Sequence, residues 1–305
     1  MTKQFSRRHA LLLMVLIPFL WSMAGIFTRQ LASMKNVEIV FWRSLFVALF
    51  VAVYLLASRK ERFLSTLRNM GWPGFVSAIM WAIVFTCFML SLTLTTVANT
   101  LLVNSITPLL TAFFARIFLG QSTPARTWIA IIFTFVGIIW IFWGNINDLQ
   151  DTHLAGLLFA LVVPFAYVVN FMIFSKAGKT VDLMPAIFLG GALSSVFMIP
   201  FAFPLDASIR DISILAILGI FQLGIPCLLL VYVARFLLPA EIALIAMLEI
   251  VLGPLWVWIG INEVPSKETL TGGFIVLLCL LFHEIASMLS ARNKRNISLI
   301  TEEKQ

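Results

Sequence analysis

The chain has 305 residues, of which 61% are hydrophobic and only 11% are charged, whereas a soluble domain is about half apolar and a quarter charged. A soluble fold of this size cannot hide so much apolar surface, so the composition excludes a soluble globular protein and indicates an integral membrane protein. The net charge of +7 does not indicate nucleic-acid binding, because the basic residues gather in short loops and at the chain ends, as they do on the cytoplasmic side of membrane proteins.

Ten segments are apolar over the roughly 20 residues that a helix needs to cross a bilayer. Polar or charged turns, such as Arg59-Lys60-Glu61-Arg62, separate most of them. We therefore predict an all-α integral membrane protein with ten transmembrane helices. In chain order, the expected spans are 10–30, 37–57, 72–93, 97–118, 126–144, 153–175, 183–203, 212–233, 240–261 and 269–289.

The first segment begins like an export signal. Ser6-Arg7-Arg8 is similar to a twin-arginine signal, and Ser22-Met23-Ala24 could mimic a cleavage site. However, the apolar stretch runs on past that position to about Leu31, and many further spans follow. We therefore interpret it as an uncleaved first span with a basic cytoplasmic flank.

The distribution of basic residues predicts the orientation. If the N-terminus lies in the cytoplasm and the loops alternate sides, Arg43 lies within a span and almost all other Lys and Arg are cytoplasmic. A missed or invented span would move every later loop to the other side and destroy this bias. The pattern therefore predicts an even number of spans with both termini in the cytoplasm. The basic residues left in outer segments are Arg29, Lys35, Arg210 and Lys267.

The two halves of the chain share a weak internal repeat. Pro18 is followed three residues later by Trp21, and Pro164 is followed in the same way by Tyr167, at an offset of 146 residues. Each half holds five spans, so the second half inserts upside down relative to the first, as in carriers built from inverted repeats. We expect two inverted five-helix repeats, at 1–148 and 149–291, and a basic cytoplasmic tail at 292–305.

Several runs carry a resemblance to a known family: Phe41-Trp42-Arg43-Ser44-Leu45, Ala98-Asn99, Thr107-Pro108, Phe221-Gln222-Leu223-Gly224, Pro239-Ala240-Glu241, Leu248-Glu249, Pro254-Leu255-Trp256-Val257-Trp258, Asn262-Glu263-Val264-Pro265-Ser266 and Gly272-Gly273. Over nearly its whole length, the chain resembles the EamA-type branch of the drug/metabolite transporter superfamily. It departs from the family pattern at Gln121, where a glutamate is usual, and at Asn262, where a glycine is usual.

The resemblance implies a multi-pass transporter of the bacterial inner (cytoplasmic) membrane that moves a small organic solute. Members of the family carry amino acids, purines, sugars, cofactors and drugs, so the resemblance does not fix the solute. We expect an amino acid or a related metabolite, moved by export through alternating access, with protons as a candidate coupling ion. No feature of the sequence specifies an oligomeric state.

Glu249 is the most informative single residue. It lies nine residues into its span, about 14 Å deep and close to the midplane of the roughly 30 Å hydrocarbon core. A lone carboxylate at that depth costs at least a few kcal/mol, so it is neutral, paired or facing water. It is a candidate for binding an amine or a proton, and the structural alternative is a protonated glutamate that hydrogen-bonds a neighbouring helix.

Arg43 lies about 9 Å into its span. It could bind a substrate carboxylate, or it could hold helices together through backbone carbonyls. Thr100, Asn104, Thr107 and Thr111 share one helix face beside Pro108, which suits either a cavity wall or hydrogen bonds between helices. Trp21 and Tyr167 lie one turn beyond matched prolines and could stack on a solute. Further candidates for substrate binding are Asn99, Gln222, Trp42, Trp81 and Asn170.

The sequence has no nucleotide-binding loop, serine elbow, zinc helix or clustered carboxylate pair. His283 and Glu284 are adjacent, so they point to different helix faces and do not form a metal pair. We expect no cofactor, no metal and no enzymatic activity. Two alternatives stay open: an intramembrane enzyme acting on a lipid-linked substrate, which needs converging reactive groups, and a non-transporting membrane subunit, which needs no central cavity.

Overall fold

In a computed structural model, every regular element of the described residues is a helix. The structure describes residues 7–31, 33–59, 63–119, 129, 132–133, 136–137, 139–140, 143, 151–178, 180–237, 242, 245–275, 277–279 and 281–282. Some features named from the sequence fall outside these residues: the basic tail at 292–305, His283 with Glu284, Gln121, the run 239–241 and residues 60–62 of the charged turn.

The first half of the chain supplies the first four predicted spans. The first consists of α1 (Arg7–Ser22) and α2 (Ala24–Arg29), and the second is α3 (Asn36–Arg59). A short helix, α4 (Phe63–Asn69), leads into the third span, α5 (Gly71–Leu94). The fourth consists of α6 (Val97–Asn104) and α7 (Thr107–Leu119). The described residues of the fifth, between 129 and 143, are helical.

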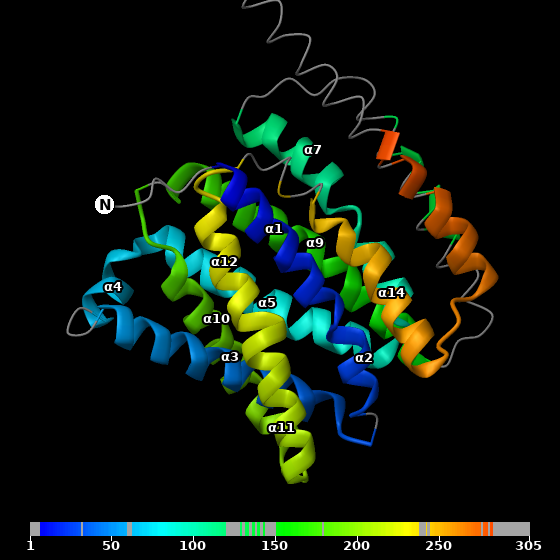
Figure 1. Ribbon diagram of the computed structural model, residues 1–305, viewed down its shortest axis with the longest axis horizontal. Coiled ribbons are helices and arrows are strands. Elements are labelled where there is room, and N and C mark those ends of the chain that lie inside the picture. Colours follow the sequence, from blue (N-terminus) through cyan, green and yellow to red (C-terminus); the bar gives the residue numbers. More distant parts are fainter. Residues whose placement is uncertain are drawn as a thin grey trace, which may run out of the picture.

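The second half continues with α9 (Asp151–Ala177) and α10 (Met184–Ala202). The eighth predicted span contains three consecutive pieces: α11 (Ile209–Ile217), a π-helical segment η2 (Leu218–Gly224) and α12 (Ile225–Val233). The ninth contains α14 (Leu248–Ile261), and residues 267–275 form the described start of the tenth. Figure 1 shows these helices as one bundle.

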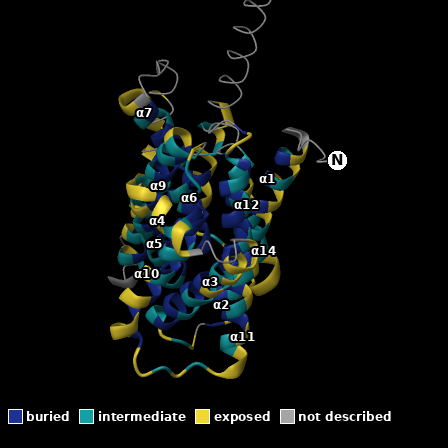
Figure 2. Ribbon diagram, turned by 90° about the vertical axis from the view of Figure 1, so that its left-hand side faces the viewer, coloured by how far each residue is buried: buried dark blue, intermediate teal, exposed yellow. Residues whose placement is uncertain are grey.

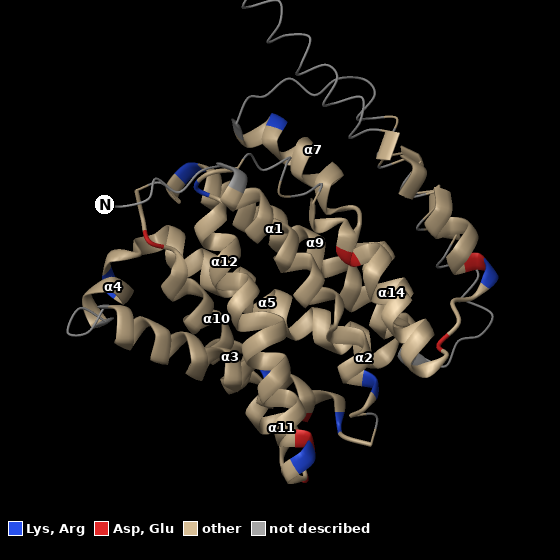
Figure 3. Cartoon of the chain, viewed as in Figure 1, with Lys and Arg blue, Asp and Glu red and all other residues tan. Residues whose placement is uncertain are grey.

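Seven of the described helices are long and apolar enough to cross a membrane, and α14 is a shorter apolar helix. Large apolar side chains also cover the outside of the bundle, as at Val53, which is 64% exposed, and Phe197, which is 65% exposed (Figure 2). Charged residues gather at helix ends and leave long helical stretches uncharged (Figure 3). An apolar exterior of this kind needs lipid as its solvent, which confirms the prediction of an all-helical membrane protein.

The core of the bundle is a row of closely packed helices. Helix α3 packs against α10, α10 against α5, and α5 against α9. Glycines allow the close approach of α3 and α10, because a Cβ added at Gly191 would lie 2.9 Å from the carbonyl oxygen of Ser44 and 3.1 Å from the nitrogen of Ala48. Small residues at helix interfaces drive packing in membranes, where lipid removes the hydrophobic driving force between helices.

Several spans are interrupted partway along their length. The first breaks at Met23, the fourth at Ser105-Ile106, and the eighth becomes π-helical over Leu218–Gly224. Proline contributes to two of the irregular regions, since Pro18 lies inside α1 and Pro108 lies in the first turn of α7. Irregular backbone at membrane depth is tolerated only where protein or a cavity surrounds it. These interruptions therefore indicate where a site could form.

Candidate functional site

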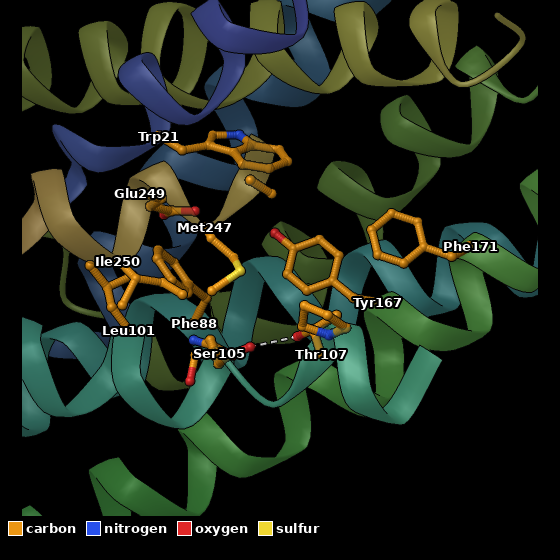
Figure 4. Close-up of a pocket in the computed structure, with 13 residues that line it drawn as sticks. Trp21, Phe88, Leu101, Ser105, Thr107, Tyr167, Phe171, Met247, Glu249 and Ile250 are labelled. Carbon is orange, nitrogen blue, oxygen red and sulfur yellow. Dashed lines mark hydrogen bonds between the residues drawn. The ribbon is translucent and has the colours of Figure 1, made fainter. Parts of the chain in front are cut away.

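A cavity of about 70 Å³ lies between α1, α5, α6, α7, α9 and α14. The break between α6 and α7 and the residues just before α14 both contribute to its wall. Its lining residues are Trp21, Phe88, Leu101, Asn104, Ser105, Thr107, Pro108, Tyr167, Phe171, Ala246, Met247, Glu249 and Ile250. Figure 4 shows the Glu249 carboxylate and the Tyr167 hydroxyl pointing into the same space beside the ring of Trp21.

A second cavity, of about 10 Å³, shares part of its wall with the first. Trp21, Phe88, Tyr167 and Glu249 line both. The second cavity adds Arg43 from α3, Val84 and Phe85 from α5, and Gln222 and Leu223 from η2. Arg43 and Glu249, which can carry opposite charges, therefore both line the second cavity.

Glu249 lies in the first turn of α14, just after a turn at Met247. The partial positive charge of a helix N-terminus stabilises a carboxylate at this position. No hydrogen bond or ion pair to this carboxylate is found among the described residues, and its side chain is half-buried rather than enclosed. The carboxylate is therefore available to a solute in the cavity.

Arg43 is only 1% exposed, and it is partly hydrogen-bonded. Its Nη2 donates to Oε1 of Gln222 at 2.8 Å, whereas its Nε and Nη1 have no partner in the described part of the chain. Gln222 in turn donates from Nε2 to the carbonyl oxygen of Trp21 at 3.1 Å. An unsatisfied buried donor is costly, so the two unused donors of Arg43 point to an acceptor that the described residues do not supply.

Aromatic rings form one wall of the site. The ring centroids of Trp21 and Tyr167 lie 6.2 Å apart, and those of Tyr167 and Trp81 lie 6.1 Å apart. Trp21 and Tyr167 are the two aromatic residues that the internal repeat matched, and their rings are in contact. They give a solute an apolar wall with hydroxyl and indole groups at its edge.

Asn104 ends α6 at the helix break. Its Nδ2 donates to the carbonyl oxygen of Thr100 at 2.9 Å, and its buried Oδ1 has no partner among the described residues. Pro108 has no N–H to bond the carbonyl oxygen of Asn104, which instead accepts from the Thr107 hydroxyl at 2.6 Å. The break therefore leaves the Asn104 side-chain oxygen as a free acceptor in the cavity wall.

Four of the predicted site residues line neither cavity. Trp42 donates to Oε1 of Glu38 at 3.3 Å. Trp81 is fully buried behind Tyr167. Asn170 accepts from Ser77 at 2.6 Å and joins α9 to α5, and Asn99 accepts from Thr269 at 2.7 Å. Asn170 and Asn99 therefore hold helices together around the cavity, whereas Trp42 bonds within α3 and the Trp81 indole nitrogen has no partner among the described residues.

The structure also adds lining residues that the sequence did not single out. Phe88, Phe171 and Met247 are apolar residues in apolar helices, and Ser105 lies in the helix break. Only the polar break beside Pro108 carried a signal, because every face of such a helix is apolar and periodicity does not distinguish lipid from cavity. Among the described residues, no group of three His, Cys, Asp or Glu is arranged to hold a metal, and the three cysteines form no disulfide.

The apolar bundle and its partly polar central cavity define a multi-pass membrane protein built around a small internal site. The sequence model of the EamA-like transporter family matches residues 8–143 and 154–283, so the chain belongs to that family. The protein is therefore a transporter of the drug/metabolite type, for which a small-molecule solute is implied.

The relatives are distant. The pseudopaline exporter CntI of Pseudomonas aeruginosa is 24% identical over 90% of this chain and 95% of its own length. The uncharacterized transporter YdfC of Bacillus subtilis is 24% identical over 59% of this chain and 61% of its own length. A protein of known crystal structure is 19% identical, with a TM-score of 0.67 over 94% of this chain and 99% of that chain, which shows a shared fold.

Proposed function

We propose that the protein is a secondary transporter that exports an amino acid or a closely related zwitterionic metabolite by alternating access. The observation that carries the proposal is that Glu249 and Arg43 both line the second cavity, which shares Glu249, Trp21 and Tyr167 with the first. Glu249 suits a cationic amine, and Arg43 suits a carboxylate. An amino acid carries both groups on one carbon.

The unused groups of the site match this solute. Nε and Nη1 of Arg43 offer two donors for a carboxylate, and a hydrogen bond to a charged group contributes roughly 1.5–3 kcal/mol. The Glu249 carboxylate and the free Oδ1 of Asn104 offer acceptors for an ammonium group. Trp21, Tyr167 and Phe88 would contact the remaining apolar part of the solute.

The helix contacts support an internal repeat that relates the first four spans to the sixth through ninth. The repeat pairs each span of the first half with the span five places later in the chain. With this pairing, the contact of α1 with α12 corresponds to that of α9 with α5. The contact of α1 with α14 corresponds to that of α9 with α6. The contact of α3 with η2 likewise corresponds to that of α10 with α5. The family model also matches twice, which supports the predicted division near residue 148. Inverted repeats permit alternating access by exchange of conformations between the halves.

The size of the cavity supports movement during transport. Ligand pockets usually enclose roughly 300–1,000 Å³, whereas this cavity holds about 70 Å³. A solute of amino-acid size therefore requires the surrounding helices to separate. The breaks in the first, fourth and eighth spans are the positions where such a change would need the least distortion of regular helix.

Charge distribution and relatives support the orientation and the direction of transport. The excess of Lys and Arg in alternate loops favours cytoplasmic termini, with 292–305 as a basic cytoplasmic tail, in a bacterial inner membrane. CntI is named as an exporter, which favours export here. Glu249 is our candidate proton site, because its carboxylate faces the cavity without a hydrogen-bond partner among the described residues.

A thermal-stability screen of the purified protein against amino acids and metabolites tests the function. A ligand at 100 times its Kd stabilises the folded state by about 2.7 kcal/mol. We expect zwitterions to stabilise the protein. The corresponding amines, which lack the carboxylate, and the N-acetyl derivatives, which lack the ammonium group, should stabilise it far less. Stabilisation by an uncharged solute, equal in the wild type and in Arg43→Gln, would contradict the proposal.

A further inference from the structure

The strongest polar cluster outside the cavity joins Arg29 at the end of α2 to Glu263 just beyond α14. Nε of Arg29 donates to Oε2 of Glu263 at 2.6 Å, and Nη2 donates to Oε1 at 3.3 Å. The side chains are 24% and 19% exposed, so the pair is partly shielded from water. A bidentate Arg–carboxylate pair in such a setting has both strength and fixed geometry.

The same two side chains also hold the connection between α5 and α6. Arg29 donates from Nη1 to the carbonyl oxygen of Leu92 at 3.1 Å and from Nη2 to that of Thr95 at 2.8 Å. Glu263 accepts the backbone N–H of Val97, the first residue of α6, at 3.1 Å. The guanidinium therefore lies at the carboxyl end of α5 and the carboxylate at the amino end of α6, where each charge is favoured by the helix dipoles.

Beneath this cluster, the first, fourth and ninth spans touch almost without a gap. A Cβ added at Gly25 would lie 2.7 Å from Val97 Cγ2 and 3.1 Å from Val257 Cγ1. A Cβ added at Gly253 would overlap the side chain of Leu101, which itself lines the cavity. Trp256 adds a hydrogen bond from Nε1 to the hydroxyl of Ser22 at 2.9 Å.

The cluster and the glycine contacts lie on one side of the cavity. From Glu249 at the cavity to Ile261 at the end of α14, two residues before Glu263, the helix advances 12 residues, about 18 Å. Between them, the packed side chains of three spans separate the cavity from the end of the bundle that carries Arg29. In the orientation proposed above, this end is the outer one.

We propose that Arg29 and Glu263 form the latch of the outer gate: their ion pair holds the first, third, fourth and ninth spans together in the outward-closed state, and it must break before solute is released. The inference rests on the proposed transport cycle. It assigns a role to Glu263 that differs from substrate binding. Breaking the latch shifts the population toward the outward-open state, because the bonds exist in only one of the two states.

Cysteine labelling tests the latch without any solute. The reporter is Thr107→Cys, at the cavity, in a background with Cys87→Ala, Cys227→Ala and Cys279→Ala. A membrane-impermeant thiol reagent is applied to intact cells and to inside-out vesicles. A separate Lys35→Cys variant identifies the face that carries the latch, because Lys35 is exposed and bonds Asp206 at the Arg29 end of α2.

Glu263→Gln should raise the labelling rate from the latch face about tenfold and lower the rate from the opposite face. Arg29→Lys keeps the positive charge but loses the forked donors of the guanidinium, so it should raise the labelling rate from the latch face by a smaller factor. It replaces Glu263→Gln as the test variant if that protein does not accumulate. Asp206→Asn removes an exposed ion pair on the same face and should change neither rate.

Unchanged labelling from the latch face in both gate variants would overturn the proposal. So would a rise from both faces together, because that indicates general loosening rather than a shift between two states. The solute screen reports failure of the proposed function, and the labelling rates do not depend on it, so the two failures are distinguishable.

Discussion

Gln222 connects the backbone of one span to the buried cation of another. It donates from Nε2 to the carbonyl oxygen of Trp21 at 3.1 Å and accepts from Nη2 of Arg43 at 2.8 Å. The residue lies in η2, where the i→i+5 pattern departs from regular α-helix. π-helical segments often occur at functional sites, and here the segment places an amide between a helix break and the guanidinium.

Gln222→Leu should weaken solute binding about tenfold and lower the melting temperature. The change removes the acceptor of Nη2 and leaves a third Arg43 donor unsatisfied, at a cost of roughly 1–3 kcal/mol. The measurement is the ligand-induced thermal shift. Gln222→Glu is the comparison variant, because it keeps an acceptor for Arg43, loses the donor to Trp21 and adds a carboxylate beside the guanidinium. Equal ligand shifts in Gln222→Leu and the wild type would rule out this role.

Glu249→Gln should reduce the affinity for a zwitterion at least tenfold, because an amide cannot balance the charge of an ammonium group. The N-acetyl form of the same amino acid lacks that ammonium, so its weak binding should not change. If Glu249 is also the proton site, the dependence of vesicle transport on the pH gradient should disappear. Unchanged proton coupling in Glu249→Gln would remove Glu249 from that role.

Gly191→Ala should destabilise the protein by about 1–3 kcal/mol, because the new methyl group would press on backbone atoms of Ser44 and Ala48, which cannot rotate away. Thermal or denaturant unfolding in detergent measures the change. Val196→Ala lies on the same helix and is 66% exposed, so it should change stability by less than about 0.5 kcal/mol. Similar losses in both variants would contradict the close packing of α3 and α10.

Ser194→Ala should cost about 0.6–1.7 kcal/mol, the range measured for hydrogen bonds between helices in a membrane protein. The Ser194 hydroxyl lies 2.9 Å from that of Ser44 and 2.8 Å from that of Thr86, so it joins three spans. Ser213→Ala is the control, because this exposed hydroxyl bonds only the carbonyl oxygen of Ile209 in its own helix. A neutral Ser194→Ala would show that the three hydroxyls do not contribute to stability.

The positions of the seven spans that the described residues contain were predictable, because a bilayer demands a helix of about 20 apolar residues and satisfies no backbone group in a loop. The expected span 72–93 is α5 (Gly71–Leu94), and the expected 183–203 is α10 (Met184–Ala202). The interruptions were harder to predict. Pro108 indicated one, and Gly224 with Pro226 indicated a bend in the eighth span, but neither residue specified the π-helical segment that places Gln222.

Six residues selected from the sequence line the two cavities. Trp21 and Tyr167 were selected because each follows a matched proline of the internal repeat. Glu249, Arg43, Asn104 and Gln222 were selected by another signal, a polar group at a depth where it is costly. The same signal selected Asn170 and Asn99, which the structure pairs with Ser77 and Thr269. A costly group can be satisfied by a solute or by another helix, and the sequence does not distinguish the two.

The sequence by itself therefore determined that the protein lies in lipid, where its helices are, and which residues require a partner. Burial in lipid penalises each unsatisfied polar group independently of where the other helices lie. Only the tertiary structure decided which partner each one has. It brought Arg29 to Glu263 across more than 200 residues, and it left Arg43 and Glu249 facing a cavity, because contacts between helices depend on crossing geometry that no single span encodes.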